Sequence, residues 1–251
     1  MEIPQNKFQI GQYILIDKPL TWTSFDVVNK VRWLIRQEYK LKKLKVGHAG
    51  TLDPLATGLL ILCTGKLTKT IDAVQTQEKE YTGVITLGAT TASYDLEKPV
   101  DIEYPTEHIT EDLIKEVAKS FIGEQEQTAP MHSAKKIDGK RAYEYAREGE
   151  TVVIKSNTIN IKEFEVQVCD FAGNEMLEDS KINQEPPYQN GIHVQFRIVC
   201  SKGTYIRAIA RDLGEKLNSG GYLSKLVRTK IGDFNVADAI TIEEVSSLFD
   251  E

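Results

Sequence analysis

The sequence predicts an α+β fold with a largely antiparallel sheet. Segments with the residue pattern of strands are interspersed with segments whose apolar residues recur at helical spacing. They do not follow a strict strand–helix–strand rhythm, which favours a mixed, mostly antiparallel sheet flanked by helices. With 251 residues, of which 41% are hydrophobic and 27% charged, the chain has the material for a sizeable core.

The N-terminal part predicts a strand followed by a helix. Residues 13–16 form a short apolar run that ends shortly before Pro19. Thr23 or Ser24 is suited to cap a helix, because its hydroxyl accepts from the free amides of the first turn. The helix is expected to reach about Tyr39, since the apolar positions that follow recur at helical spacing: Val27, Val28, Val31, Leu34 and Ile35.

An irregular loop is expected next, after a lysine-rich connection. Residues 46–54 contain three small residues and a proline, which mark a break in regular structure. The apolar run 59–63 then predicts a buried strand, and residues 68–75 a short helix. The remaining expected elements are, in order, a β-rich segment 81–87, an acidic proline-containing loop 95–106, a helix 110–121, an excursion 125–150, β-rich segments 151–169 and 192–200 joined by a polar, mobile loop 173–190, a helix 205–217, a strand 225–234 and a closing helix 241–249.

Membrane and secreted classes are not favoured by this sequence. No apolar stretch approaches the roughly 20 residues that a membrane helix needs, and residues 1–12 lack the apolar centre of a signal peptide. Cys63, Cys169 and Cys200 form neither a CxxC pair nor a metal-binding spacing. Reduced thiols and a cytoplasmic location are therefore expected.

Charge is segregated along the chain, although the total is only −6, from 31 Lys+Arg and 37 Asp+Glu. Residues 30–48 hold seven Lys/Arg and one acid, and residues 197–230 hold eight Lys/Arg and two acids. Residues 95–126 and 233–251 are acidic. Converging basic segments would make a phosphate-binding face on an acidic body, whereas charge alone favours ordinary solvated surfaces.

Several familiar sites are excluded by their spacing. The segment from Gly58 to Lys66 resembles a phosphate loop, but six residues separate its glycines instead of four, and Leu67 occupies the magnesium-binding Ser/Thr position. There is no GxGxxG, HExxH or GxSxG motif. ATP, NAD and metal chemistry therefore lose support, and no cofactor or metal is expected.

The segment 47–58, Gly-His-Ala-Gly-Thr-Leu-Asp-Pro-Leu-Ala-Thr-Gly, is the strongest candidate site. Pro54 fixes its own φ and restricts Asp53, and the surrounding glycines allow a sharp bend or a close approach to a ligand. An apolar strand follows directly and anchors the loop. By pattern alone, an aspartate in such a loop is more often a turn or cap residue than a catalytic group.

This segment resembles the signature of the TruB-type pseudouridine synthases. Four further blocks match that family in the same order: residues 15–19, residues 79–81, residues 133–136 with 139–147, and residues 200–207 with 212–214. The resemblance covers about residues 11–232 and implies the pseudouridine synthase fold. It also implies that the family's insertion, which clamps the RNA loop, corresponds to residues 125–150. His132 stands where many relatives have tyrosine.

The resemblance makes Asp53 the nucleophile of a uridine isomerisation. This reaction breaks the C1′–N1 bond and makes a C1′–C5 bond without net redox change, so it needs no cofactor. A carboxylate attacks C1′ or assists loss of uracil from it; attack at C6 of the base is the alternative, and the sequence leaves both open. Either route needs ionised Asp53, which burial disfavours unless a cation is near. The family arginine maps to Arg207, for which an ion pair with Asp53 is expected.

The other expected site residues also come from the resemblance. Tyr81 stacks on the target base and helps to remove the C5 proton, and Tyr205 and Leu226 line the uracil pocket. His48 fills the space left by the flipped nucleotide. Two lysines complete the substrate-binding set: Lys18, which is structural or phosphate-facing, and Lys69, a phosphate contact.

The implied function is isomerisation of uridine 55 in the TΨC loop of tRNA. The expected partner is the TΨC stem-loop, without a guide RNA and without a membrane, and the protein is expected to be a monomer. Residues 233–251 are expected to be a short acidic tail rather than a full PUA domain. Two alternatives stay open: an RNA-binding tRNA-folding module, and a synthase that acts on another RNA.

Overall fold

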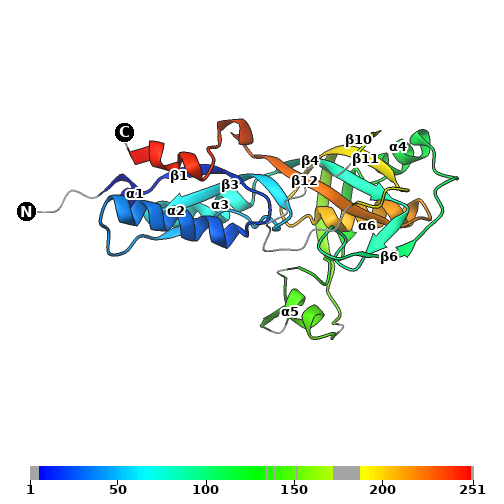
Figure 1. Cartoon of the computed structure of the whole chain (residues 1–251), viewed down its shortest axis with the longest axis horizontal. Helices are drawn as coiled ribbons and strands as arrows, with labels where there is room; N and C mark the ends of the chain where they lie inside the picture. The colour runs from blue at the N-terminus through cyan, green and yellow to red at the C-terminus, as the bar shows by residue number, and fades with distance from the viewer. Residues whose placement is uncertain (1–5, 134, 138, 151, 172–186, 250–251) are drawn as a thin grey trace, which may run out of the picture. The chain divides into compact units, whose positions relative to one another are not determined.

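A computed structural model describes residues 6–133, 135–137, 139–150, 152–171 and 187–249 (Figure 1). Residues 173–186 of the expected polar loop therefore lie outside the described residues. The chain divides into two compact units. Unit 1 comprises Met1–Tyr81 and Val227–Glu251, and unit 2 comprises Thr82–Leu226.

The main sheet has nine strands and is largely antiparallel. Seven of them pair in the order β1-β3-β12-β4-β11-β10-β7, while β2 pairs with β3 and β13 pairs with β12. The pairs β1–β3, β2–β3, β10–β11, β7–β10 and β12–β13 are antiparallel. Two strands, β4 (Lys79–Leu87) and β12 (Gly221–Ile231), contribute residues to both units. The predicted α+β class is confirmed.

Unit 1 is built around β1 and β3, with helices on both of their faces. Besides its parts of β4 and β12, the elements of unit 1 are α1 (Lys7–Ile10), β1 (Tyr13–Lys18), α2 (Ser24–Glu38), β2 (Val46–His48), β3 (Ala56–Thr64), the 3₁₀ helix η1 (Gly65–Thr70), α3 (Ile71–Gln75), β13 (Phe234–Asn235), η2 (Val236–Asp238) and η3 (Glu243–Phe249). Successive side chains of β3 point to opposite faces. Leu60 and Leu62 pack with the apolar face of α2, whereas Leu59 and Ile61 pack with Val74 of α3.

The acidic segment after residue 232 is folded against unit 1. Val245 of η3 is fully buried in the same core as α2, and Leu248 and Phe249 pack against that core. Tyr39 donates from its hydroxyl to the carbonyl of Phe249 at 3.1 Å. The predicted closing helix is thus present, as a 3₁₀ helix.

In unit 2, helix α4 packs against strand β10 and contacts helix α6. The elements of unit 2 beside β4 and β12 are β5 (Ala89–Thr91), β6 (Val100–Glu103), α4 (Glu111–Lys119), β7 (Gly123–Gln127), β8 (Lys136–Ile137), β9 (Lys140–Arg141), α5 (Ala142–Arg147), β10 (Asn157–Val168), β11 (Ile192–Cys200) and α6 (Ile206–Lys216). Edge-to-face contacts link Phe121, Phe164 and Phe196 at centroid distances of 5.9 and 6.3 Å. The expected excursion is the part of unit 2 that carries β8, β9 and α5.

The sequence-based expectations were wrong for two short strands, which were expected to be loops. Val46–His48 was expected to be part of an irregular loop but forms β2, and Val100–Glu103 of the expected acidic loop forms β6. Both strands have three or four residues, too few for alternation to distinguish them from a loop. Among the described residues, no helix is long and apolar enough to cross a membrane.

Candidate active site

The loop 49–55 between β2 and β3 carries Asp53 and is fixed at both ends by strand pairing. Val46 pairs with Thr64 and His48 with Leu62. The N–H of Ala49 donates to the carbonyl of Ile61 at 2.9 Å, and the N–H of Ala56 donates to the carbonyl of Asp53 at 3.0 Å. The aspartate thus stands on a short loop that joins two strands paired with each other, β2 and β3.

Ser24 anchors the residue before Asp53. Its hydroxyl accepts from the N–H of Leu52 at 2.9 Å and donates to the carbonyl of Leu52 at 3.1 Å. Ser24 is buried at the start of α2, where Thr23 forms the N-cap and a capping box with Asp26. The sequence offered Thr23 or Ser24 as the cap. In the structure Thr23 is the N-cap residue, whereas the hydroxyl of Ser24 is hydrogen-bonded to the loop.

Lys18 anchors the residue after Asp53. The side chain is fully buried, and Nζ donates to the carbonyls of Pro19 at 2.8 Å, Trp22 at 2.7 Å and Pro54 at 3.2 Å. Of the two roles expected for Lys18, these contacts describe the structural one. A phosphate-facing lysine would present its ammonium group to solvent, and this one does not.

Arg228 of β12 holds the first part of the loop and was not predicted from sequence. Its side chain is 1% exposed. Nε donates to the carbonyl of Leu59 at 2.8 Å, and the two terminal nitrogens donate to Gly50 at 3.1 Å and Thr51 at 3.4 Å. The alternation along the strand was a signal for this contact. Arg228 falls on the same face of β12 as Tyr222, Ser224 and Leu226, and all three of these residues are buried.

Gly50 in the loop and Gly58, the third residue of β3, have the geometry that the sequence indicated. Gly50 has φ of +101° and Gly58 has φ of +95°, which L residues rarely adopt. A Cβ at Gly58 would lie 2.4 Å from the carbonyl oxygen of Arg228. Gly58 therefore permits both the backbone turn and the close approach of β12.

Asp53 is half-buried and lies within the electrostatic influence of Lys18. Burial lowers the pKa of Lys18 to about 7, and the negative charge of Asp53 acts in the opposite direction. The positive charge of Arg228 also lowers the pKa of Lys18. Unit 1 therefore brings the Asp53 carboxylate and two buried basic side chains to the same loop.

His48 lies at the end of β2, next to this loop. Burial lowers its pKa, the backbone of Gly50 raises it, and the positive charge of Arg228 lowers it. Among the buried side-chain polar atoms of the described residues, its Nδ1 is one of two without a hydrogen-bond partner. A neutral imidazole with an unused polar atom is suited to accept or donate a hydrogen bond to a ligand.

The remaining unit 1 candidates lie on other elements. Tyr81 is a buried residue of β4, 8% exposed. Lys69 is exposed near the end of η1. Within the described part of the chain, Lys69 makes no ion pair, and its contact with a phosphate stays a prediction.

Arg207 is a buried residue of α6 rather than a helix-surface side chain, with 5% exposure. Its two terminal nitrogens donate to the carbonyls of Ser93 at 3.0 Å and His132 at 2.9 Å, and Nε lies 3.6 Å from a carboxylate oxygen of Asp95. These contacts within unit 2 were not foreseen. The expected ion pair with Asp53 of unit 1 stays a prediction.

Tyr205 and Leu226 are the other unit 2 candidates. Tyr205 precedes α6, and its N–H and carbonyl pair with the side-chain amide of Gln127 at 2.8 and 3.1 Å. Its ring packs against a small core, formed by Ala129, Ala142 and Ile154, at the base of the excursion. Leu226 is buried on β12.

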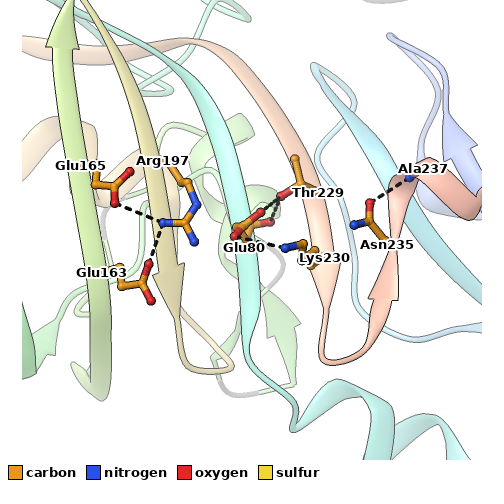
Figure 2. A network of polar contacts seen from close by, with 8 residues as sticks. All are labelled: Glu80, Glu163, Glu165, Arg197, Thr229, Lys230, Asn235 and Ala237. Carbon is orange, nitrogen blue, oxygen red and sulfur yellow. Dashed lines mark hydrogen bonds and ion pairs between the residues drawn. The ribbon is translucent and has the colours of Figure 1, made fainter.

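The second basic segment, residues 197–230, uses much of its charge within the protein (Figure 2). Arg197 of β11 lies between Glu163 and Glu165 of β10, at 2.6 and 3.4 Å. Glu80 accepts from Thr229 at 2.7 Å and lies 3.8 Å from Nζ of Lys230. Arg207 and Arg228 are buried. These basic side chains do not form an exposed phosphate-binding face.

Comparison with known proteins places this arrangement in one family. The sequence model described as TruB family pseudouridylate synthase (N terminal domain) matches residues 36–206, and that described as tRNA pseudouridylate synthase B C-terminal domain matches residues 207–251. The chain is 49% identical to tRNA pseudouridine synthase B of Phocaeicola vulgatus over 97% of this chain and 95% of that protein. It is 50% identical to the protein of the same name from Flavobacterium johnsoniae over 96% and 95%.

Solved structures share the fold of this chain. A Cbf5-Nop10-Gar1 complex matches with a TM-score of 0.64 and 27% identity, over 96% of this chain. An H/ACA RNP bound to a substrate RNA containing 2′-deoxyuridine matches with a TM-score of 0.61 and 26% identity, again over 96%. This chain spans 55% and 54% of those two chains. By the sequence matches, the chain belongs to the TruB family of pseudouridylate synthases.

Proposed function

We propose that this protein isomerises uridine 55 in the TΨC loop of tRNA to pseudouridine, with Asp53 as the nucleophile. The observation that carries the proposal is the position of Asp53 on a loop held by three independent anchors. Ser24 fixes Leu52, Lys18 fixes Pro54, and Arg228 fixes Gly50 and Thr51. Such preorganisation is what a covalent step at a single carbon atom needs.

The reaction itself is a rearrangement that balances without a cofactor. The C1′–N1 bond breaks and the C1′–C5 bond forms, and the C5 proton leaves while N1 gains a proton. Asp53 attacks C1′ or C6, and its release restores the carboxylate. The described residues contain no group of three or more His, Cys, Asp and Glu side chains suited to hold a metal ion.

Two basic side chains lie on the same unit as Asp53. They are Lys18, whose pKa the charge of Asp53 raises, and Arg228, which holds Gly50 and Thr51. We further propose that Arg207 pairs with Asp53 when RNA is bound. The Arg207 side chain is already ordered by Ser93 and His132, so little rotamer entropy remains to be lost on pairing.

The other candidates are assigned to base binding. Uridine within a folded loop must be everted to reach Asp53, at a cost of a few kcal/mol. We assign Tyr81 to stacking on the base and removal of the C5 proton, and Tyr205 and Leu226 to the uracil pocket. The unpartnered Nδ1 of His48 supports its assignment to the space that the uridine vacates.

The direct test uses the purified protein and unmodified tRNA transcript, with no guide RNA and no other component. Pseudouridine should be mapped at position 55 and at no other uridine of the transcript. Activity only after addition of a guide RNA or another protein would place the chain with the ribonucleoprotein synthases. Improved tRNA folding without any pseudouridine would favour the tRNA-folding alternative.

A further inference from the structure

The outer face of α2 combines exposed aromatic and basic side chains. Phe25 is 62% exposed and Trp33 is 53% exposed, while the opposite face of the helix packs into the core. Arg32 and Arg36 lie seven and eleven residues after Phe25, so all three project from nearly the same side of the helix. We call Phe25, Arg32, Trp33 and Arg36 the α2 outer face.

The connection after the helix extends this surface with further cations. Lys40, Lys42, Lys43 and Lys45 are all exposed. In the described part of the chain, none of these four lysines, nor Lys30, Arg32 or Arg36, makes an ion pair. This contrasts with Arg197, which is held between two glutamates. The charge of residues 30–45 is therefore not neutralised by the protein itself.

The mixture of side chains indicates the kind of partner. Nζ of Lys30 lies 5.1 Å from the ring centroid of Trp33, and Arg32 donates to Asn29 on the same helix. An apolar protein partner would have to bury these charges. A nucleic acid suits both kinds of side chain, because its phosphates bind the cations and a base or ribose packs on the aromatic ring.

The direction of α2 determines which part of an RNA would reach this surface. The helix begins at Ser24, which is hydrogen-bonded to Leu52 beside Asp53. It runs from Ser24 to Glu38, which is about 21 Å at 1.5 Å per residue. The lysine-rich connection lies beyond that end. A contact at the end of α2 and the start of this connection is thus made roughly 20 Å along the helix from Ser24.

We propose that the α2 outer face and the connection 40–45 bind the backbone of the tRNA outside the TΨC arm. This inference rests on the proposed function for the identity of the RNA. It assigns a second contact region to the same substrate, distinct from the pocket for the target uridine. Its contribution is affinity and preference for whole tRNA, not chemistry at Asp53.

The test compares full-length tRNA with an isolated TΨC hairpin, neither of them modified. Lys42→Gln/Lys43→Gln removes two exposed charges, and Trp33→Ala removes the ring. The matched control is Lys98→Gln/Lys119→Gln, which removes two exposed lysine charges from unit 2. Dissociation constants are measured over a range of salt concentrations, together with the rate of pseudouridine formation at saturating RNA.

The double lysine variant should weaken binding of full-length tRNA. It should also lower the slope of log Kd against log salt by roughly 0.7–0.9 for each phosphate that the variant no longer neutralises. Trp33→Ala should weaken binding by about 5-fold or more. Binding of the hairpin and the saturated rate should not change, and the control should behave as wild type.

Three results would overturn the proposal: unchanged binding of tRNA, an equally weakened binding of the hairpin, or an equal effect in the control. Failure of the proposed function is distinguishable from these, because wild-type protein would then form no pseudouridine while the binding differences persisted.

Discussion

The hydroxyl of Ser24 makes two hydrogen bonds with the backbone of Leu52, at 2.9 and 3.1 Å. The first residue of α2 thereby determines the position of the residue that precedes Asp53. The helix is in turn fixed by its capping box and by the core beneath it. Local helix chemistry and the position of the candidate nucleophile are therefore coupled.

Ser24→Ala should destabilise the protein by about 1–3 kcal/mol, because it leaves the buried amide of Leu52 without its partner. It should also lower kcat more than it weakens tRNA binding, since only the loop is released. Urea unfolding and single-turnover rates measure the two effects. Ser247→Ala, at an exposed serine of η3, should stay within about 0.5 kcal/mol. Equal effects for the two variants would contradict this role for Ser24.

Gly58→Ala should be considerably more destabilising than Gly203→Ala. Both glycines have positive φ, +95° and +80°, so both substitutions carry a strain of about 1–2 kcal/mol. Only Gly58 adds a clash, since its Cβ would lie 2.4 Å from the carbonyl oxygen of Arg228, while nothing lies within 4 Å at Gly203. Thermal unfolding of the two variants side by side isolates the clash, and indistinguishable melting temperatures would refute it.

Arg228→Met should cost at least about 3 kcal/mol, because three carbonyls lose hydrogen bonds from a charged donor that are each worth about 1.5–3 kcal/mol. In the fraction that remains folded, pseudouridine formation should fall while the Kd for tRNA changes little. Arg197→Met is the control, since this half-buried arginine on β11 is paired with Glu163. The control substitution should cost about 1 kcal/mol or less.

Lys18 should make the protein more stable as pH rises above 7. Burial lowers the pKa of Lys18 from 10.5 to about 7. Between these values the unfolded chain binds a proton that the folded protein does not, so stability increases with pH, by at most about 1.4 kcal/mol per pH unit. Above pH 9, Cys63 acts oppositely, because burial raises its pKa to about 11.

The window that isolates Lys18 is therefore about pH 7–8.5. Urea unfolding across it should show a rising free energy for wild type and a flatter dependence for Lys18→Met, whatever the absolute stability of the variant. Asp53→Asn should shift the rise to lower pH, because the charge of Asp53 raises the pKa of Lys18. Parallel curves for wild type and Lys18→Met would rule out this titration.

The sequence predicted those parts of the site that depend on local conformation. Gly50 and Gly58 were expected at sharp bends, and both have positive φ. The strand after the loop and the helix before it follow from apolar spacing, which needs no knowledge of distant partners. The family resemblance, carried by ordered motifs, added the pseudouridine synthase fold and the candidate nucleophile to the α+β class that the residue patterns predicted.

The parts that were missed depend on contacts between distant segments. Arg228 is 178 residues from Gly50, to which it donates, and Asp95 lies far from Arg207 along the chain. Neither contact leaves a local pattern in the sequence, apart from a charged residue at a position where an apolar residue is expected. Lys18 shows the same limit: the sequence placed it near the loop, but only the structure shows that its ammonium group is occupied by three carbonyls.

The most direct test of the central claim is pseudouridine formation by Asp53→Asn, which keeps the size of the side chain and removes its charge. The account predicts that this variant binds tRNA about as well as wild type and forms no pseudouridine at position 55, even at enzyme excess. Asp72→Asn, at an exposed aspartate of the same unit, should retain full activity. An Asp53→Asn rate within tenfold of wild type would contradict the assignment of Asp53 as the nucleophile.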